Sequence, residues 1–318
     1  MKAIVYTGYG SPEVLQLKDV EKPIPKYNEI LIKVRATAVN SGDVRLRKAD
    51  PFMVRLVFGL FKPKIKILGV VFSGEIESIG SGVQRFKVGD EVFGHSDMSF
   101  GTYAAYKCVS EDGSLALKPD CISHQEAAVI PFGGTTALHF LKKTAIQKGH
   151  KVLIFGASGA VGTAAVQLAK HFGATVTAVC SKENINLVQS LGADKVIDYT
   201  LEDFTKEGET YDVIFDTVNK MSISKGVKCL HKKGVLILGA SLLKETLHGV
   251  WISLTSKRKV LSGMISHKAE DIIFLKQLIE EGQLKPVIDK IYTLEQMAEA
   301  HTYVEKGHKK GNVAIEMN

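Results

Sequence analysis

The first part of the chain, up to about residue 110, consists of short runs of β-branched and other apolar residues between turn-forming residues. Runs of this length, bounded by Gly, Pro and Asp, are typical of strands, so this part is predicted to be β-rich. Turns are expected at Gly80–Gly82 and Val88–Asp90. The clearest predicted strands are Ala3–Tyr6, Glu29–Ala38, Phe72–Ile79 and Glu91–Phe93.

From about residue 125 the pattern changes, and short apolar runs alternate with helical stretches. Such alternation of strand and helix is typical of a parallel, doubly wound α/β sheet. Helices are predicted at Ala160–His171 and Asn184–Leu191. The predicted strands are Val152–Phe155, Thr175–Cys180, Val213–Asp216, Val235–Gly239 and Val260–Met264.

The last part of the chain mixes both patterns. It predicts a helix at Glu270–Glu281, a strand at Val287–Ile291, a helix at Leu294–Lys306 and a final strand at Asn312–Glu316. The final strand has no partner of its own in the sequence, so we expect it to return to the β-rich part.

The chain is therefore predicted to contain one domain, residues 1–122 and 267–318, interrupted by a dinucleotide-binding Rossmann domain, residues 123–266. Because ligands of open parallel sheets bind at the carboxyl ends of the strands, we expect the site to lie in a cleft between the domains.

Composition places the chain among ordinary globular proteins. Its 318 residues are 45% hydrophobic and 24% charged, which suits about two domains. The cysteines occur without a CxxC pair, which argues against a structural zinc lobe and a disulfide scaffold. No apolar stretch is long enough to span a membrane, and the start does not resemble a signal peptide, so a cytoplasmic protein is expected. The cysteines are Cys108, Cys121, Cys180 and Cys229.

The net charge is mildly basic. Lysine and arginine number 41 against 34 acidic residues, which gives +7. Because the lysines are scattered, a solvated surface is favoured over nucleic-acid binding, which needs a concentrated basic patch.

The strongest local motif is a glycine loop between the first predicted parallel strand and its helix. Gly156-Ala-Ser-Gly-Ala-Val-Gly162 follows the apolar strand, and it matches the dinucleotide fingerprint with Ala157 in place of the first glycine. The helix N-terminus would supply amide donors and partial positive charge to a pyrophosphate. The residues expected to contact the cofactor here are Ser158, Gly159, Ala160 and Val161.

The end of the next strand distinguishes the two nicotinamide cofactors. An NAD site usually carries an acidic residue there, whereas this strand ends in Ser181-Lys182. A hydroxyl and an ammonium would bind a 2′-phosphate, so NADP(H) is predicted. Glu183 lies one residue further on and leaves NAD as the alternative.

Six stretches, the glycine loop among them, resemble the zinc-free quinone oxidoreductases of the medium-chain dehydrogenase/reductase family, whose first domain is GroES-like. Zinc-dependent relatives carry Cys in place of Asn40 and His-Glu in place of Val70-Val71, so no catalytic zinc is expected. His95 and His124 are expected to be surface or hydrogen-bonded histidines. The stretches are 38–43, 68–80, 86–94, 101–106, 134–137 and 156–162.

The resemblance also implies roles for single residues. Asn40 and Asp43 would shape the nicotinamide side of the site, and Thr135 would lie near the adjoining phosphate. Tyr199 would line the 2′-phosphate beside Lys182, with a simple cover of the sheet edge as the alternative. Further residues implied to border the cofactor are Val218, Gly239, Ser241, Lys310 and Asn312.

The activity implied is hydride transfer from NADPH, without zinc, to a small hydrophobic quinone or an α,β-unsaturated carbonyl such as an enal. Arg45, Pro51 and Phe52 occupy places where many relatives have tyrosines, so acceptors that take a proton from solvent are favoured. Arg45 either stabilises developing negative charge or is simply solvated. An NADPH-binding sensor or an RNA-binding protein of the same fold with little turnover stays open, and relatives suggest a homodimer.

One segment has three interpretations. Residues Pro51–Phe61 are apolar and are followed by Lys62, Lys64 and Lys66. The segment would form a lid over a hydrophobic substrate, rest on a membrane surface, or be a buried connecting helix.

Overall fold

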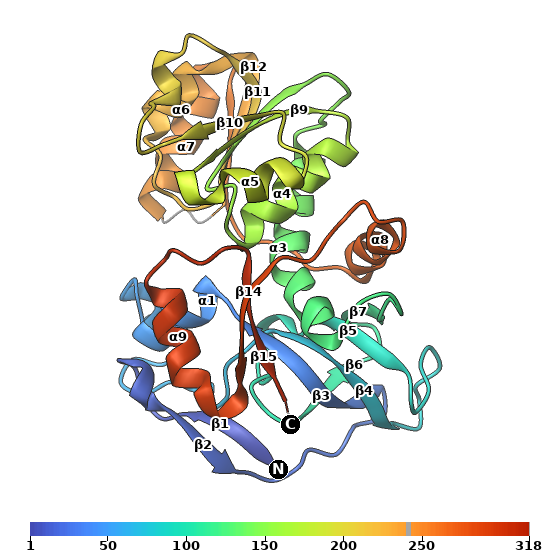
Figure 1. Ribbon diagram of the computed structural model, residues 1–318. Coiled ribbons are helices and arrows are strands. Elements are labelled where there is room, and N and C mark those ends of the chain that lie inside the picture. The colour runs from blue at the N-terminus through green and yellow to red at the C-terminus, as the bar shows by residue number, and fades with distance from the viewer. Residues whose placement is uncertain (240–242, 318) are drawn as a thin grey trace. The chain divides into compact units, whose positions relative to one another are not determined.

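The computed structural model describes residues 1–239 and 243–317, which fall into two compact units (Figure 1). The β-rich unit comprises residues 1–132, 267–281 and 286–318, and the parallel-sheet unit comprises residues 133–266 and 282–285. The predicted domain boundary at 122/123 precedes helix α3 (His124–Lys143), whereas the units divide inside that helix, between Phe132 and Gly133. The helix is continuous across this point, so no turn or change of pattern marks it in the sequence.

The β-rich unit is built on a sheet whose described strands run in the order β14-β15-β3-β4-β5-β7, with β6 also paired to β3. A separate hairpin of β1 and β2 accompanies it. The strands are β1 (Lys2–Tyr6), β2 (Leu15–Asp19), β3 (Glu29–Val39), β4 (Val71–Ile79), β5 (Glu91–His95), β6 (Tyr106–Ser110), β7 (Ser114–Leu117), β14 (Ile288–Thr293) and β15 (Asn312–Glu316). The helices are α1 (Ser41–Lys48), α2 (Met53–Phe58), α8 (Ala269–Glu280) and α9 (Met297–Glu305).

The final strand pairs with the β-rich part, which confirms the prediction for it. β15 runs antiparallel to β3, with Val313 opposite Val39 and Glu316 opposite Ala36. Figure 1 shows this red strand beside the blue strand β3. The apolar core accordingly draws on both ends of the chain, from Ile4 to Ile315.

The parallel-sheet unit has the strand order β10-β9-β8-β11-β12-β13, with all described neighbours parallel. This is the doubly wound Rossmann order, so the predicted fold class is confirmed. The strands are β8 (Lys151–Phe155), β9 (Thr175–Cys180), β10 (Lys195–Asp198), β11 (Tyr211–Asp216), β12 (Leu230–Leu238) and β13 (Lys259–Leu261). The helices besides α3 are α4 (Ala160–His171), α5 (Ile185–Ser190), α6 (Ile223–Lys228) and α7 (Leu243–Thr255).

The apolar segment after α1 is largely exposed. Phe58 packs edge-on against Phe100, but Phe52 is 62% exposed and Phe61 is 87% exposed. The interpretation as a buried connecting helix is therefore wrong, because α2 has only six residues and leaves much of the apolar segment facing solvent. Among the described helices, none combines the length and apolar character needed to cross a bilayer.

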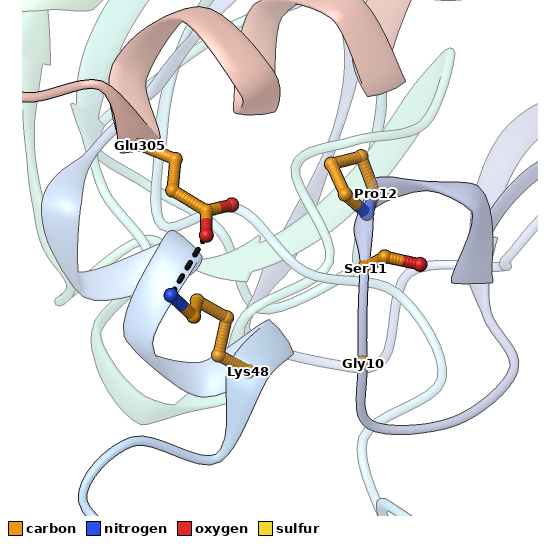
Figure 2. Close-up of a pocket in the computed structure, with 5 residues that line it drawn as sticks. All are labelled: Gly10, Ser11, Pro12, Lys48 and Glu305. Atoms are coloured by element: carbon orange, nitrogen blue, oxygen red, sulfur yellow. Dashed lines mark ion pairs between the residues drawn. The ribbon is translucent and has the colours of Figure 1, made fainter.

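A buried arginine joins distant parts of the β-rich unit. Arg47 on α1 is fully buried, and its guanidinium donates to the carbonyl oxygen of Gly10 at 2.9 Å and to the carboxylate of Glu305 on α9. Lys48 also pairs with Glu305, at 2.7 Å. Figure 2 shows this second pair at the edge of a pocket of about 300 Å³, which Gly10, Ser11 and Pro12 also line.

Removal of the Glu305 charge is expected to destabilise the β-rich unit. Glu305→Gln would leave the buried Arg47 guanidinium without its counter-ion, which costs about 3 kcal/mol, the lower end for buried pairs, since Glu305 is one-third exposed. Urea unfolding followed by circular dichroism measures the loss. The control Glu280→Gln breaks an exposed i,i+4 pair with Lys276 and should cost less than about 0.5 kcal/mol. Equal effects of the two variants would contradict the role given to Arg47.

Candidate functional site

The glycine loop connects β8 to α4 in a conformation that depends on its glycines. Gly156 has a φ of +79°, which side chains rarely adopt. A Cβ on Gly162 would lie 2.2 Å from the carbonyl oxygen of Gly156, so only glycine lets α4 pack this close to the loop. At Gly159, by contrast, a Cβ would meet no described protein atom within 3.5 Å.

These contacts fit a bound pyrophosphate. Gly159 is the N-cap of α4, and Ala160 and Val161 are its first residues, where helical N–H groups lack partners within the helix. The open space at Gly159 lets an anion approach these donors. Thr135, on α3 in the same unit, is fully buried.

A buried asparagine that the sequence analysis missed ties the glycine loop to the next strand end. The Asn184 side-chain nitrogen donates to the hydroxyls of Ser158, at 3.2 Å, and of Ser181, at 3.0 Å. Its Oδ1 is also buried and has no hydrogen-bond partner among the described residues. Its position three residues after Ser181 was the only signal in the sequence, and that signal does not distinguish it from a helix N-cap.

Lys182 and Tyr199 follow the carboxyl ends of the neighbouring strands β9 and β10. Asp198 lies opposite Cys180 in the ladder, and the Tyr199 backbone N–H donates to the Cys180 carbonyl at 3.2 Å. Lys182 is exposed and Tyr199 is 53% exposed, so both side chains are accessible to a ligand.

The loop after β11 is shaped by a buried carboxylate. Asp216 is fully buried and accepts backbone N–H groups from Val218, at 3.0 Å, and from Asn219 and Met221. Burial raises its pKa despite these donors. Val218 lies at the same carboxyl edge of the sheet, with 39% of its surface exposed. The Gly239 backbone N–H donates to the backbone carbonyl of Asp216. Ser241 lies outside the described residues.

In the β-rich unit, Asn40 and Asp43 lie where β3 ends and α1 begins. The Asn40 backbone N–H donates to the Asp43 carboxylate at 3.0 Å, and both residues are almost fully buried. Burial raises the pKa of Asp43 to about 6, against the lowering effect of the Asn40 N–H and the nearby Tyr103 hydroxyl. The Asn40 side-chain nitrogen is buried without a partner among the described residues, which leaves a donor for a ligand. Arg45 is exposed on α1.

The two C-terminal candidates, Lys310 and Asn312, form hydrogen bonds with other residues of the β-rich unit. The Lys310 backbone N–H donates to Asp289 at 2.9 Å. Asn312 is buried, and its side-chain nitrogen donates to the Val287 carbonyl at 3.1 Å. The side chain of Asn312 therefore stabilises the start of β15 in the structure, whereas its predicted contact with the cofactor stays a prediction.

The residues at the positions of the family's zinc ligands are Asn40, Val70 and Val71, and valine cannot bind a metal. His124 contacts Ser73 Oγ at 2.8 Å and Glu91 at 3.2 Å, so it is hydrogen-bonded as expected. His95 is buried, and its Nδ1 accepts the Asp97 N–H at 2.9 Å.

Known families and proteins match both units. The family described as "Alcohol dehydrogenase GroES-like domain" matches residues 26–120, and that described as "Zinc-binding dehydrogenase" matches residues 191–315. The chain is 35% identical to the 2-methylene-furan-3-one reductase of Solanum lycopersicum, over 99% of this chain and 79% of that protein. It is 34% identical, with the same coverage, to the chloroplastic NADPH-dependent alkenal/one oxidoreductase of Arabidopsis thaliana.

Among solved structures, the quinone oxidoreductase from Coxiella burnetii superposes with a TM-score of 0.91 at 30% identity. The match covers 100% of this chain and 99% of that one. With the Rossmann strand order, the glycine loop and the return of β15, these likenesses show that the chain belongs to the medium-chain dehydrogenase/reductase family, in its quinone oxidoreductase group.

Proposed function

We propose that this protein is an NADPH-dependent oxidoreductase that transfers hydride, without zinc, to quinones or to α,β-unsaturated carbonyls. The observation that carries the proposal is the glycine loop next to Ser181-Lys182, in a chain whose relatives are named for such reactions over 99% of its length. The substrate is a small hydrophobic quinone, enal or enone.

The parallel-sheet unit would hold the cofactor with neutral donors at the pyrophosphate and with a positive charge at the 2′-phosphate. The first amides of α4 and the Ser158 hydroxyl would bind the pyrophosphate. Ser181, Lys182 and Tyr199 would surround the 2′-phosphate, to which an ammonium adds a charge-assisted hydrogen bond. Bound NADPH supplies a hydride from C4 of its nicotinamide.

The β-rich unit would supply the polar groups on the acceptor side. The side-chain amide of Asn40 has no partner among the described residues, so it is available to a nicotinamide or acceptor oxygen. Asp43 holds the Asn40 backbone in place by accepting the Asn40 backbone N–H. Arg45 would stabilise the negative charge that develops on a reduced carbonyl or quinone oxygen.

Homodimer formation in a reducing compartment such as the cytoplasm belongs to the same proposal. β13 is the edge of the parallel sheet, and α7, which precedes it, exposes Leu247, Val250, Trp251 and Leu254. An exposed apolar face beside an open strand edge favours association with a second copy, which light scattering tests. All four cysteines are free, which suits a reducing compartment.

The first prediction concerns the cofactor. The protein should oxidise NADPH with a quinone or an enal, unaffected by a chelator, and Lys182→Glu should raise KM for NADPH by about tenfold or more. The same variant should narrow the preference for NADPH over NADH, because a carboxylate repels the 2′-phosphate. The assay follows the loss of NADPH absorbance. Lys148→Glu is the matched control, since this exposed lysine precedes β8 at its amino end.

One outcome would count against the role of Lys182, and another would count against the reductase activity. Equal effects of Lys182→Glu and Lys148→Glu would remove Lys182 from the site. Tight NADPH binding without turnover of any acceptor would favour the alternative, a sensor or RNA-binding protein, and a salt-sensitive affinity for RNA would then support it.

The second prediction concerns Arg45. Arg45→Ala should lower kcat roughly tenfold with little change in KM for NADPH, because the guanidinium would act only as charge develops. Arg45→Lys should retain most of the rate, since it keeps the positive charge. Steady-state kinetics with a quinone measures both variants. An unchanged kcat in Arg45→Ala would identify a solvated arginine.

The third prediction concerns contact with a membrane surface, where quinones dissolve. Phe52, Leu56 and Phe61 have exposed side chains and are followed in the sequence by Lys62 and Lys64, and no acidic residue occurs between Asp50 and Glu75. Apolar insertion next to positive charge favours an anionic bilayer. The protein should sediment with phosphatidylglycerol vesicles more than with phosphatidylcholine vesicles, and Leu56→Glu/Phe61→Glu should abolish this. Vesicle binding that survives the double substitution would favour the lid interpretation of this segment.

A further inference from the structure

Asn184, in the parallel-sheet unit, has a buried side chain whose hydrogen bonds do not stabilise its own helix. It is the N-cap of α5, where the side-chain oxygen of an asparagine usually accepts a backbone N–H of the first turn. Here the side chain forms no such cap. Its Oδ1 has no partner among the described residues, although Asn184 is only 8% exposed. Helix capping therefore does not explain an asparagine at this position.

The side-chain nitrogen of Asn184 instead donates to two serine hydroxyls at neighbouring strand ends. Nδ2 lies 3.2 Å from the Ser158 hydroxyl and 3.0 Å from the Ser181 hydroxyl. Ser158 follows β8, and Ser181 follows β9, which pairs with β8 in the sheet. The Asn184 backbone N–H also donates to the Ser181 carbonyl, at 2.9 Å, which holds the amide beside that serine. A side-chain amide has two N–H groups, so the two serines use both of them.

These contacts determine in which direction the two serine hydroxyls can donate. A hydroxyl has one proton, and an amide N–H directed at its oxygen occupies a lone pair, so the proton of each serine points away from Asn184. Among the described residues, no group accepts either proton. Both serines are half-buried, so a ligand can reach them. The protons of Ser158 and Ser181 are therefore available to an acceptor outside the chain.

We propose that Asn184 is a positioning residue for the cofactor, which directs the Ser158 proton to the pyrophosphate and the Ser181 proton to the 2′-phosphate of NADPH. The inference rests on the proposed function, which assigns these serines to the two phosphate groups. A hydroxyl that donates to a phosphate forms a charge-assisted hydrogen bond, which is stronger than a bond between neutral groups. One buried amide thus serves both anionic groups of the cofactor, and only the 2′-phosphate distinguishes NADPH from NADH.

Calorimetric titration of the full-length protein with NADPH and with NADH, without any acceptor, tests this role. Asn184→Asp keeps the size of the side chain but replaces the donor by an acceptor, so both serines would donate to the carboxylate instead of the phosphates. Asn184→Ala removes the donor and leaves the hydroxyls free to rotate. The affinity for NADPH should fall about tenfold or more in Asn184→Asp and by less in Asn184→Ala. A side chain needed only for packing would give the opposite order, because alanine leaves a cavity.

Asn186→Asp is the matched control for the added negative charge. Asn186 is exposed on the same helix, two residues after Asn184, so this variant brings a carboxylate close to the site without replacing the buried amide. Solvent and salt screen a charge at an exposed position, so the affinity for NADPH should fall by less than about threefold. Thermal unfolding checks that each variant is folded.

Combined substitutions test whether Asn184 acts through the two serines. Ser181→Ala should weaken binding of NADPH and leave binding of NADH nearly unchanged, whereas Ser158→Ala should weaken binding of both. In a protein with both serines replaced, Asn184→Ala should have little further effect, because it has no hydroxyl left to orient. These neutral variants keep the test valid if Asn184→Asp does not fold.

Three results would overturn the role of Asn184 alone, provided that the unaltered protein binds NADPH. The first is an affinity for NADPH in Asn184→Asp that equals that in Asn186→Asp. The second is a larger loss in Asn184→Ala than in Asn184→Asp, and the third is an undiminished effect of Asn184→Ala when both serines are absent. Failure of the unaltered protein to bind NADPH would overturn the proposed function and this inference with it.

Discussion

The arrangement of Asn40 and Asp43 depends on one ion pair, between the buried Arg47 guanidinium and the partly exposed Glu305 carboxylate. The two residues are 258 positions apart in the sequence, and they belong to the first and the last of the three segments that make up the β-rich unit. Arg47 lies on α1, four residues after Asp43, so the pair that fixes the end of this helix also fixes the residues at its start. A buried guanidinium without a counter-ion destabilises the folded state. Helix α1 is therefore stably packed only when the C-terminal helix α9 lies beside it and supplies the Glu305 carboxylate.

The parallel-sheet unit also relies on buried polar groups, at the carboxyl edge of its sheet. Asp216 and Asn184 are buried polar groups whose hydrogen bonds hold the loops after β11 and β9, while Lys182, Tyr199 and Val218 stay accessible. Buried groups that satisfy backbone and side-chain donors determine loop shape, and exposed neighbours are then free to contact a ligand. Accessible side chains on a fixed edge are what binding of a charged dinucleotide needs.

Local patterns predicted the parallel sheet better than the details of the site. Helix α4 has the predicted bounds Ala160–His171, because an apolar strand, a glycine loop and an amphipathic helix follow each other directly. Strand β12 begins at Leu230 rather than Val235, since its first residues are polar and the ladder shifts near Tyr211. The Arg47–Glu305 pair and the stacked rings of His95 and His267 join residues far apart in sequence, which periodicity cannot detect. Exposure of Phe52 and Phe61 likewise depends on what packs nearby, so sequence alone left three interpretations.

The state of Asp43 bears on which acceptors the proposed reaction would use. Burial raises the pKa of this carboxyl to about 6, still below neutral pH, so the ionised form is favoured there, and an ionised carboxylate accepts hydrogen bonds rather than donating a proton. It is also buried and engaged by the Asn40 N–H, so giving up that contact would loosen the start of α1. Burial and the nearby Asp43 charge raise the pKa of Tyr103 well above its usual value, which makes this phenol a poor acid. With neither group suited to donate, a proton taken from solvent is the simplest completion of the reaction. Quinones and conjugated carbonyls, whose reduced forms are protonated readily in water, meet that condition.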